Sequence, residues 1–302
     1  MKGWMYLVGC LLVVLEVAAQ PPIALVDIPA GVKESRDMEF RESSETFEVR
    51  AGLVFIEAYL NGVAGMYVVD TGAPGLVLNQ KPEGENDLEG RGVTGTLAVE
   101  ETQVDQFQLG LVQFRKLKAY KIDLSHLENR LHCRIDGLIG YEVLREMEIV
   151  LDYPNQVITF RSGNGWDIDR ESGAGFTFHL VNHIPVVEAS LGKRSISLGL
   201  DTGAGANVLN KHLGNPYRAK NSERQRIRGV DRKMKNTMAV QVPVAIDGLE
   251  LSKQDQEYWL LNLSQLHIDL DRPIDGLLGF PFLKDGKWSI NYHTSRIRLY
   301  NP

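Results

Sequence analysis

The sequence contains two copies of the tetrapeptide Asp-Thr-Gly-Ala, which begin at Asp70 and at Asp201. Each copy directly follows a short apolar segment, at residues 66–69 and 197–200. Two carboxyl groups held close together cannot both ionise at low cost, so the pair shares one proton, and one member can act as a base while the other acts as an acid. Such a pair can activate water for hydrolysis, and we take Asp70 and Asp201 as the candidate catalytic residues.

The two tetrapeptides belong to a longer internal repeat. A Glu-Ala pair lies thirteen residues before each aspartate, and Asn79 and Asn210 lie nine residues after them. An Ile-Asp-Gly-Leu-Ile/Leu-Gly segment follows at residues 135–140 and 274–279, and each half ends in a hairpin pattern. One Asp-Thr-Gly arises easily by chance, whereas two copies inside a repeat of this length indicate a duplicated structural unit.

The elements that must position the aspartates are mainly strands. Apolar, strand-like runs separated by glycines occur at residues 54–60, 66–70, 95–101 and 149–160, and helical patterns are limited to one or two turns at 124–129, 141–146, 263–266 and 280–284. We therefore predict a mostly β fold. We divide the chain into a signal peptide at 1–19, a tether or propeptide at 20–46, an N-terminal lobe at 47–161, a linker at 162–175 and a C-terminal lobe at 176–302.

The N-terminus has the pattern of a secretory signal. Lys2 precedes an apolar region at 5–17, and small residues lead to an expected cleavage after Ala19. That region is shorter than the ~20 residues of a membrane span, so we expect an exported protein, periplasmic or secreted, with no stable membrane span. Cys10 lies in a sequence similar to a lipidation box, but the apolar run continues past it, which disfavours lipid attachment. Residues 20–46 are aperiodic and fit a propeptide, a tether or an edge strand.

The net charge and the number of cysteines limit the partners and the cross-links that we expect. The net charge of −6 gives no indication of a nucleic-acid partner. If Cys10 is removed with the signal, Cys133 is the only thiol, and no intramolecular disulfide can form. Stability must then come from packing.

These motifs resemble the aspartic peptidase superfamily, in its retropepsin-like branch. The resemblance covers residues 47–302 and implies two small closed barrels related by a pseudo-twofold axis, an extended peptide or protein substrate, and no metal or cofactor. It implies support of the two catalytic carboxyls by Thr71, Gly72, Ala73, Thr202, Gly203 and Ala204, with the threonine hydroxyls bonding across the lobe interface. It also implies a bracing role for Gly137, Gly140, Gly276 and Gly279. Because both lobes lie in one chain, we expect a monomer.

Two departures from the pepsin pattern are informative. Pepsins usually carry Ser or Thr after the glycine, whereas Ala73 and Ala204 offer no hydroxyl to the charged carboxyl. Loss of that hydrogen bond should raise the pKa values of the pair and favour activity from mildly acidic to near-neutral pH. Glycine-bearing segments after both aspartates predict two flaps rather than one, which would cover a bound peptide. The flap residues are Gly92, Val93, Thr94, Gly95, Gly229 and Val230.

Two further aspartates, two histidines and one basic segment are more simply explained by structural roles than by chemistry. Asp136 and Asp275 are expected to brace turns, and His179 and His183 lie on a strand pattern that separates their rings by about 13 Å, too far for a metal pair. The basic segment at 217–236 is interpreted as a solvated hairpin. The alternative is a second flap that favours acidic substrates or docks on an anionic surface.

Two other functions remain open at this stage. One is a non-catalytic homologue that binds peptides or polymers in the same cleft. The other is an actin-like or sugar-kinase-like ATPase, which the shortage of long helices disfavours.

Overall fold

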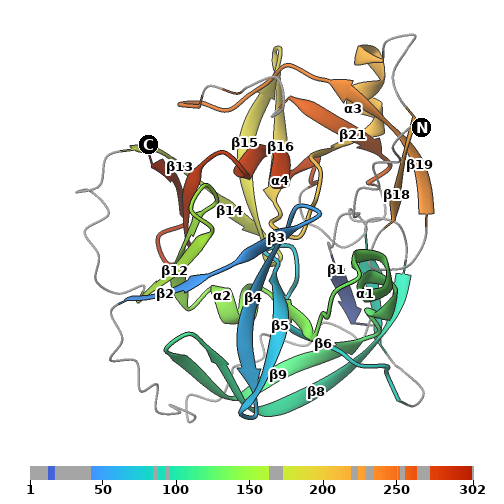
Figure 1. The fold of residues 1–302 in the computed structure, drawn as a ribbon. Helices are drawn as coiled ribbons and strands as arrows, with labels where there is room; N and C mark the ends of the chain where they lie inside the picture. The colour runs from blue at the N-terminus through green and yellow to red at the C-terminus, as the bar shows by residue number, and fades with distance from the viewer. Residues whose placement is uncertain are drawn as a thin grey trace.

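The computed structural model describes residues 13–17, 42–83, 88–92, 96–162, 173–218, 224–228, 234–249, 251, 256–263 and 273–300. The fold is mostly β, as predicted. In Figure 1 the strands of the first half lie in the lower part of the molecule and those of the second half in the upper part. None of the helices in these ranges is long and apolar enough to cross a membrane.

The first half contains a closed barrel. Its strands are β4 (Leu53–Leu60), β5 (Val63–Val69), β6 (Leu76–Asn79), β8 (Thr96–Leu109), β9 (Val112–Ile122) and β10 (Gly137–Ile139). They pair in the order β4-β5-β10-β6-β9-β8, and β8 returns to pair with β4, so the ring has no free edge there. Strand β3 (Glu48–Arg50) pairs with β4, and β7 (Leu88–Gly92) forms a hairpin with β8.

The second half repeats this arrangement. Its strands are β14 (His179–Val181), β15 (Ile184–Leu191), β16 (Arg194–Leu200), β17 (Val208–Asn210), β18 (Arg224–Arg228), β19 (Met234–Gln241), β20 (Val244–Ala245), β21 (Glu257–Leu261) and β22 (Gly276–Leu278). The order β15-β16-β22-β17-β21-β19 matches that of the first barrel. Gly137 lies opposite Tyr67, and its counterpart Gly276 lies opposite Leu198, so the register matches as well.

A six-stranded sheet joins the two halves. Its order is β13 (Gly173–Thr177), β24 (Arg296–Tyr300), β23 (Lys287–Asn291), β11 (Met147–Asp152), β12 (Val157–Ser162) and β2 (Glu42–Thr46). At its centre Val150 pairs with Ser289, and each lies three residues before the tyrosine of its own hairpin, Tyr153 or Tyr292. The two hairpins therefore meet at equivalent positions.

Buried apolar side chains explain why this sheet holds. Ile149 and Ile290 face each other in the register and are fully buried. They belong to a hydrophobic cluster that draws residues from both halves, while smaller clusters fill each barrel. Burial of apolar area is the main favourable term in such an interface. The two halves thus share one core.

Two edge strands begin outside the predicted lobes. Strand β2 begins at Glu42, within the segment interpreted as a tether, propeptide or edge strand, and β13 begins at Gly173, within the predicted linker. Their sequences, Glu-Ser-Ser-Glu-Thr and Gly-Ala-Gly-Phe-Thr, lack the apolar alternation that marks a strand. Both form because a neighbouring hairpin strand offers its open edge.

The helices are short. Helices α1 (Ser125–Leu131), α2 (Tyr141–Leu144) and α4 (Phe280–Leu283) occur where helical patterns were predicted, and the predicted turn at 263–266 lies mostly outside the described residues. Helix α3 (Lys211–Gly214) and the 3-10 turn η2 (Asn215–Tyr217) were not predicted. Of the predicted signal peptide, only 13–17 is described, as strand β1 (Val13–Val17) paired with β7.

Candidate active site

Both candidate aspartates follow the last residue of a strand and occupy equivalent loops. Asp70 comes after β5 and Asp201 after β16. The amide of Asp70 donates to the carbonyl of Ile139 at 2.9 Å, and the amide of Asp201 donates to that of Leu278 at 2.9 Å. Each loop is therefore fixed by the strand that carries the later glycine motif of its own half.

The glycine after each threonine orients the carboxyl group. The amide of Gly72 donates to Oδ1 of Asp70, and the amide of Gly203 donates to Oδ1 of Asp201, both at 2.9 Å. Gly203 also leaves room for the opposite half, because a Cβ atom on it would lie only 2.4 Å from Cγ of Asp70. Glycine is thus required at 203 by the close approach of the Asp70 carboxyl.

Thr71 and Thr202 make reciprocal hydrogen bonds between the halves. The Thr71 hydroxyl donates to the carbonyl of Leu200 at 2.7 Å, and the Thr202 hydroxyl donates to that of Val69 at 2.8 Å. Each hydroxyl oxygen also accepts from the backbone amide of the other threonine at 3.0 Å. Four buried hydrogen bonds therefore fix one aspartate loop against the other.

The two carboxyl groups lie in a site closed to solvent. The exposed fraction of both Asp70 and Asp201 is 0%. Burial, and next the charge of Asp201, raise the pKa of Asp70 well above its ordinary value, while the amides of Gly72 and Ala73 oppose the shift. Among the described residues, Oδ2 of Asp70 has no hydrogen-bond partner. The arrangement favours a protonated Asp70 beside an ionisable neighbour.

Ala73 and Ala204 complete the two loops without a hydroxyl. Both are fully buried, and their amides donate to the carbonyls of Asp70 and Asp201 at 3.1 Å. Their carbonyls accept from the amides of Tyr141 and Phe280 at 2.9 and 2.8 Å. Each loop is thereby tied to the first residue of a short helix, α2 or α4.

The four glycines predicted to brace the loops lie where backbone approaches backbone. A Cβ atom on Gly137 would lie 1.9 Å from the carbonyl oxygen of Val77, and one on Gly276 would lie 2.4 Å from that of Val208. Cβ atoms on Gly140 and Gly279 would lie 2.4 Å from the carbonyl oxygens of Ala73 and Ala204, respectively. A side chain at Gly140 or Gly279 would displace an aspartate loop, and one at Gly137 or Gly276 would push away β6 or β17.

The predicted flap tips lie largely outside the described residues. Gly92 is the last residue of β7, whereas Val93, Thr94, Gly95, Gly229 and Val230 are not described. The strands that flank both tips do form antiparallel hairpins, β7 with β8 and β18 with β19. The basic segment contributes β18.

Asp136 and Asp275 have structural hydrogen bonds. Oδ2 of Asp136 accepts from the amide of Met66 at 2.8 Å, and Oδ2 of Asp275 accepts from the amide of Ser197 at 3.1 Å. Both amides belong to the strands that lead into the aspartate loops. The two carboxyls therefore act as backbone braces, away from the aspartate pair.

His183 is a residue of the site that sequence reasoning missed. It lies in the turn between β14 and β15, is buried, and its Nε2 lies 2.9 Å from the carbonyl oxygen of Gly72. Because a carbonyl can only accept, Nε2 carries the hydrogen. Burial lowers the pKa of His183 to about 4, against the weaker opposing effect of this hydrogen bond. A neutral histidine thus links the second half to the first aspartate loop.

The first half has no counterpart of this histidine. Gly52 lies 18 residues before Asp70, as His183 lies 18 residues before Asp201. Its φ is +83°, and a Cβ atom on it would lie 3.0 Å from Cα of Gly205. Only a comparison of the two repeats could have marked residue 183 as part of the site, because His183 by itself has the sequence context of an ordinary strand residue.

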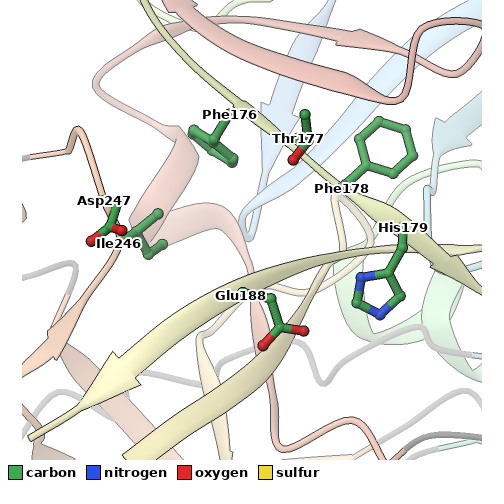
Figure 2. Close-up of a pocket in the computed structure, with 7 residues that line it drawn as sticks. All are labelled: Phe176, Thr177, Phe178, His179, Glu188, Ile246 and Asp247. Atoms are coloured by element: carbon green, nitrogen blue, oxygen red, sulfur yellow. The ribbon is translucent and has the colours of Figure 1, made fainter. Parts of the chain in front are cut away.

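A separate pocket of about 250 Å³ lies in the second half, away from the aspartates. Figure 2 shows its wall, formed by Phe176, Thr177, Phe178, His179, Glu188, Ile246 and Asp247. No group of His, Cys, Asp or Glu side chains within the described ranges could hold a metal ion. The acidic side chains in the lining of the pocket are Glu188 and Asp247.

Comparison with known families gives a match for the segment that contains the first aspartate loop. Residues 56–143 match the aspartyl protease family, a segment that runs from β4 to α2 and contains Asp70, Gly137 and Gly140. A search of curated proteins finds no match. The family match supports an aspartic-peptidase-like protein. The second aspartate lies outside the matched segment, and its link to the first is the repeat and the strand pairing described above.

We predict that Thr71→Val weakens the junction between the halves. Valine keeps the shape but removes the hydroxyl that donates to Leu200 and accepts from Thr202, so the free energy of unfolding should fall by about 2–4 kcal/mol. Urea denaturation measures this change. Thr159→Val is the control, because its hydroxyl bonds only an exposed serine, Ser44; equal stability of the two variants would contradict the prediction.

We predict that His183 makes stability depend on pH. Its pKa is lower in the folded state than the ordinary value of ~6.5, so its contribution is complete above pH 6.5 and is lost as pH falls toward about 4. His183→Gln keeps a donor for Gly72 without titrating, and should unfold with a smaller pH slope across this range. Urea denaturation of both proteins from pH 4 to 7 measures the contribution of His183 to this pH dependence. Parallel plots of unfolding free energy against pH would refute its role.

Proposed function

We propose that this protein is an aspartic endopeptidase in which Asp70 and Asp201 activate the water that cleaves a peptide bond. The main support is that both carboxyl groups are buried in two loops, and that reciprocal hydrogen bonds of Thr71 and Thr202 join these loops. The raised pKa of Asp70 and the aspartyl protease match of residues 56–143 support the same assignment.

The chemistry follows from the unequal protonation of the pair. Asp70 holds the shared proton, and ionised Asp201 accepts a proton from the attacking water. As the water oxygen bonds to the substrate carbonyl carbon, Asp70 donates its proton to the carbonyl oxygen, which gives a tetrahedral diol. Return of a proton to the nitrogen then allows the C–N bond to break. The net reaction consumes one water and releases a carboxylic acid and an amine.

The architecture supports an extended peptide as substrate. We propose that the halves are two retropepsin-like lobes of a duplicated chain, which act as a monomer because the pair is assembled within one polypeptide. The hairpins β7–β8 and β18–β19 would cover the substrate and pair with its backbone. The signal-like N-terminus leads us to propose export as the setting of this activity.

We predict that Asp70→Asn and Asp201→Asn each lower peptide hydrolysis by about 10²–10⁴-fold, because each removes one member of the acid–base pair. The measurement is cleavage of a diverse peptide mixture by the purified mature protein, analysed by mass spectrometry, with a statine-type inhibitor as a second probe. Asp285→Asn is the matched control, since its side chain is 79% exposed. Peptides left intact by the wild type at every pH would favour a binding protein instead.

We predict an activity optimum at mildly acidic to near-neutral pH. The reaction needs Asp70 protonated and Asp201 ionised, so the raised pKa of Asp70 extends activity upward, and the missing hydroxyls at Ala73 and Ala204 act in the same direction. A profile of kcat/KM against pH tests this. A maximum well below pH 4 would show that the environment does not raise the pKa of the pair.

A further inference from the structure

Two buried tyrosines occupy equivalent positions at the ends of the hairpin strands that join the halves. Tyr153 follows β11 and Tyr292 follows β23, and their exposed fractions are 5% and 8%. The repeat therefore conserves an aromatic residue with a hydroxyl group at the same place in both halves of this chain.

Each tyrosine ring packs against an aromatic residue of the opposite half. Tyr153 lies edge-on to Phe280, with ring centres 6.0 Å apart, and Tyr292 lies edge-on to Tyr141 at 5.5 Å. Within its own half, Tyr153 contacts Phe47 and Tyr292 contacts Phe178, both at 5.7 Å. The contacts are thus crossed in the same way as the threonine hydrogen bonds.

The aromatic partners connect the tyrosines to the catalytic loops. Phe280 donates its amide to the carbonyl of Ala204, and Tyr141 donates to that of Ala73. Tyr153 therefore lies against the helix start that supports the Asp201 loop, and Tyr292 against the one that supports the Asp70 loop. Each tyrosine is thus linked to the aspartate loop of the opposite half through one ring contact and one backbone hydrogen bond.

Within the described residues, the hydroxyl groups of Tyr153 and Tyr292 are buried without a hydrogen bond. An unpaired buried hydroxyl costs free energy, and replacement of each tyrosine by phenylalanine would fill the same space without that cost. The presence of two such hydroxyls at equivalent positions indicates a role beyond packing.

Electrostatics links each hydroxyl to one aspartate. Burial raises the pKa of Tyr153 most, and the charge of Asp201 adds to the shift. Burial also raises the pKa of Tyr292 most, and the charges of Tyr141 and then Asp70 raise it further. Both phenols stay neutral, so each keeps a hydrogen that can rotate toward a nearby negative charge.

We propose that Tyr153 and Tyr292 are positioning residues whose O–H dipoles stabilise the ionised form of the aspartate pair, Tyr153 acting on Asp201 and Tyr292 on Asp70. They would offset part of the rise in pKa that the missing hydroxyls at Ala73 and Ala204 cause. In a buried site of low dielectric such a dipole acts more strongly than in water. The proposal rests on the function proposed above for Asp70 and Asp201.

Of the aromatic residues that contact the two tyrosines within the described part of the chain, only Tyr141 is titratable. Phe47 and Phe280 beside Tyr153 carry no charge, as does Phe178 beside Tyr292. Tyr141 is titratable, and Arg145 lies over its ring at 5.5 Å. A change in the titration of the pair after removal of a hydroxyl can therefore be assigned to that hydroxyl.

The test is the carboxyl titration of the pair in Tyr153→Phe, Tyr292→Phe and the double variant. Protein labelled with ¹³C at the aspartate carboxyls is titrated by NMR, and the signals are assigned with Asp70→Asn and Asp201→Asn. Loss of a stabilising dipole should raise the apparent pKa values of the pair by about 0.5 or more per variant, and further in the double variant. Tyr67→Phe is the matched control, because this buried tyrosine faces Asp136 and Arg134 instead.

Activity and stability supply the second readout. The acidic limb of the kcat profile should move to higher pH in the tyrosine variants, with KM unchanged, while their Tm stays equal or rises because an unpaired hydroxyl is lost. An unmoved titration in the folded double variant would overturn the proposal, and a lower Tm with unmoved titration would assign the hydroxyls to packing. If the wild type cleaves no peptide but the titration moves, the proposed peptidase function fails and the tyrosine effect stands.

Discussion

Two carboxyl groups buried side by side are held together by the reciprocal hydrogen bonds of Thr71 and Thr202. Burial and mutual repulsion both oppose this arrangement, because each disfavours the charged form. The four crossed bonds resist that repulsion with backbone groups that cannot move without disturbing β5 and β16. The remaining structure serves to keep those two strand ends in register, through the glycine-bearing strands β10 and β22 and through the central sheet.

The near-symmetry of the molecule breaks at the site itself. His183 bonds the carbonyl of Gly72, whereas its counterpart Gly52 packs against Gly205. The amide of Gly279 donates to the side chain of Asn207, whereas the equivalent amide of Gly140 donates to a backbone carbonyl. The two aspartate loops therefore have different surroundings. Unequal surroundings are what allow one carboxyl to hold a proton while the other ionises.

Sequence reasoning predicted the features that depend on local pattern. The β class follows from short apolar runs between glycines, and the pairing of Asp70 with Asp201 follows from their identical contexts in the repeat. It left an edge strand as one of three alternatives for the segment that contains β2, and it did not predict β13, because polar and glycine-rich edge strands carry no alternation and form only where a partner edge is available. Phe280 and Tyr141 looked like ordinary helix residues, and their contacts with the hairpin tyrosines come from segments far apart in the chain.

The sequence by itself determined which side chains are available and that they come in matched sets, since residue identity and spacing are properties of the chain. Only the tertiary structure decided which groups meet. The approach of Gly203 to Asp70, the His183 bond to Gly72 and the crossed tyrosine contacts all join residues from opposite halves. Their geometry is fixed by the pairing of β11 with β23 and the core buried around it. Local sequence carries no record of such contacts, because they arise from the packing of whole sheets.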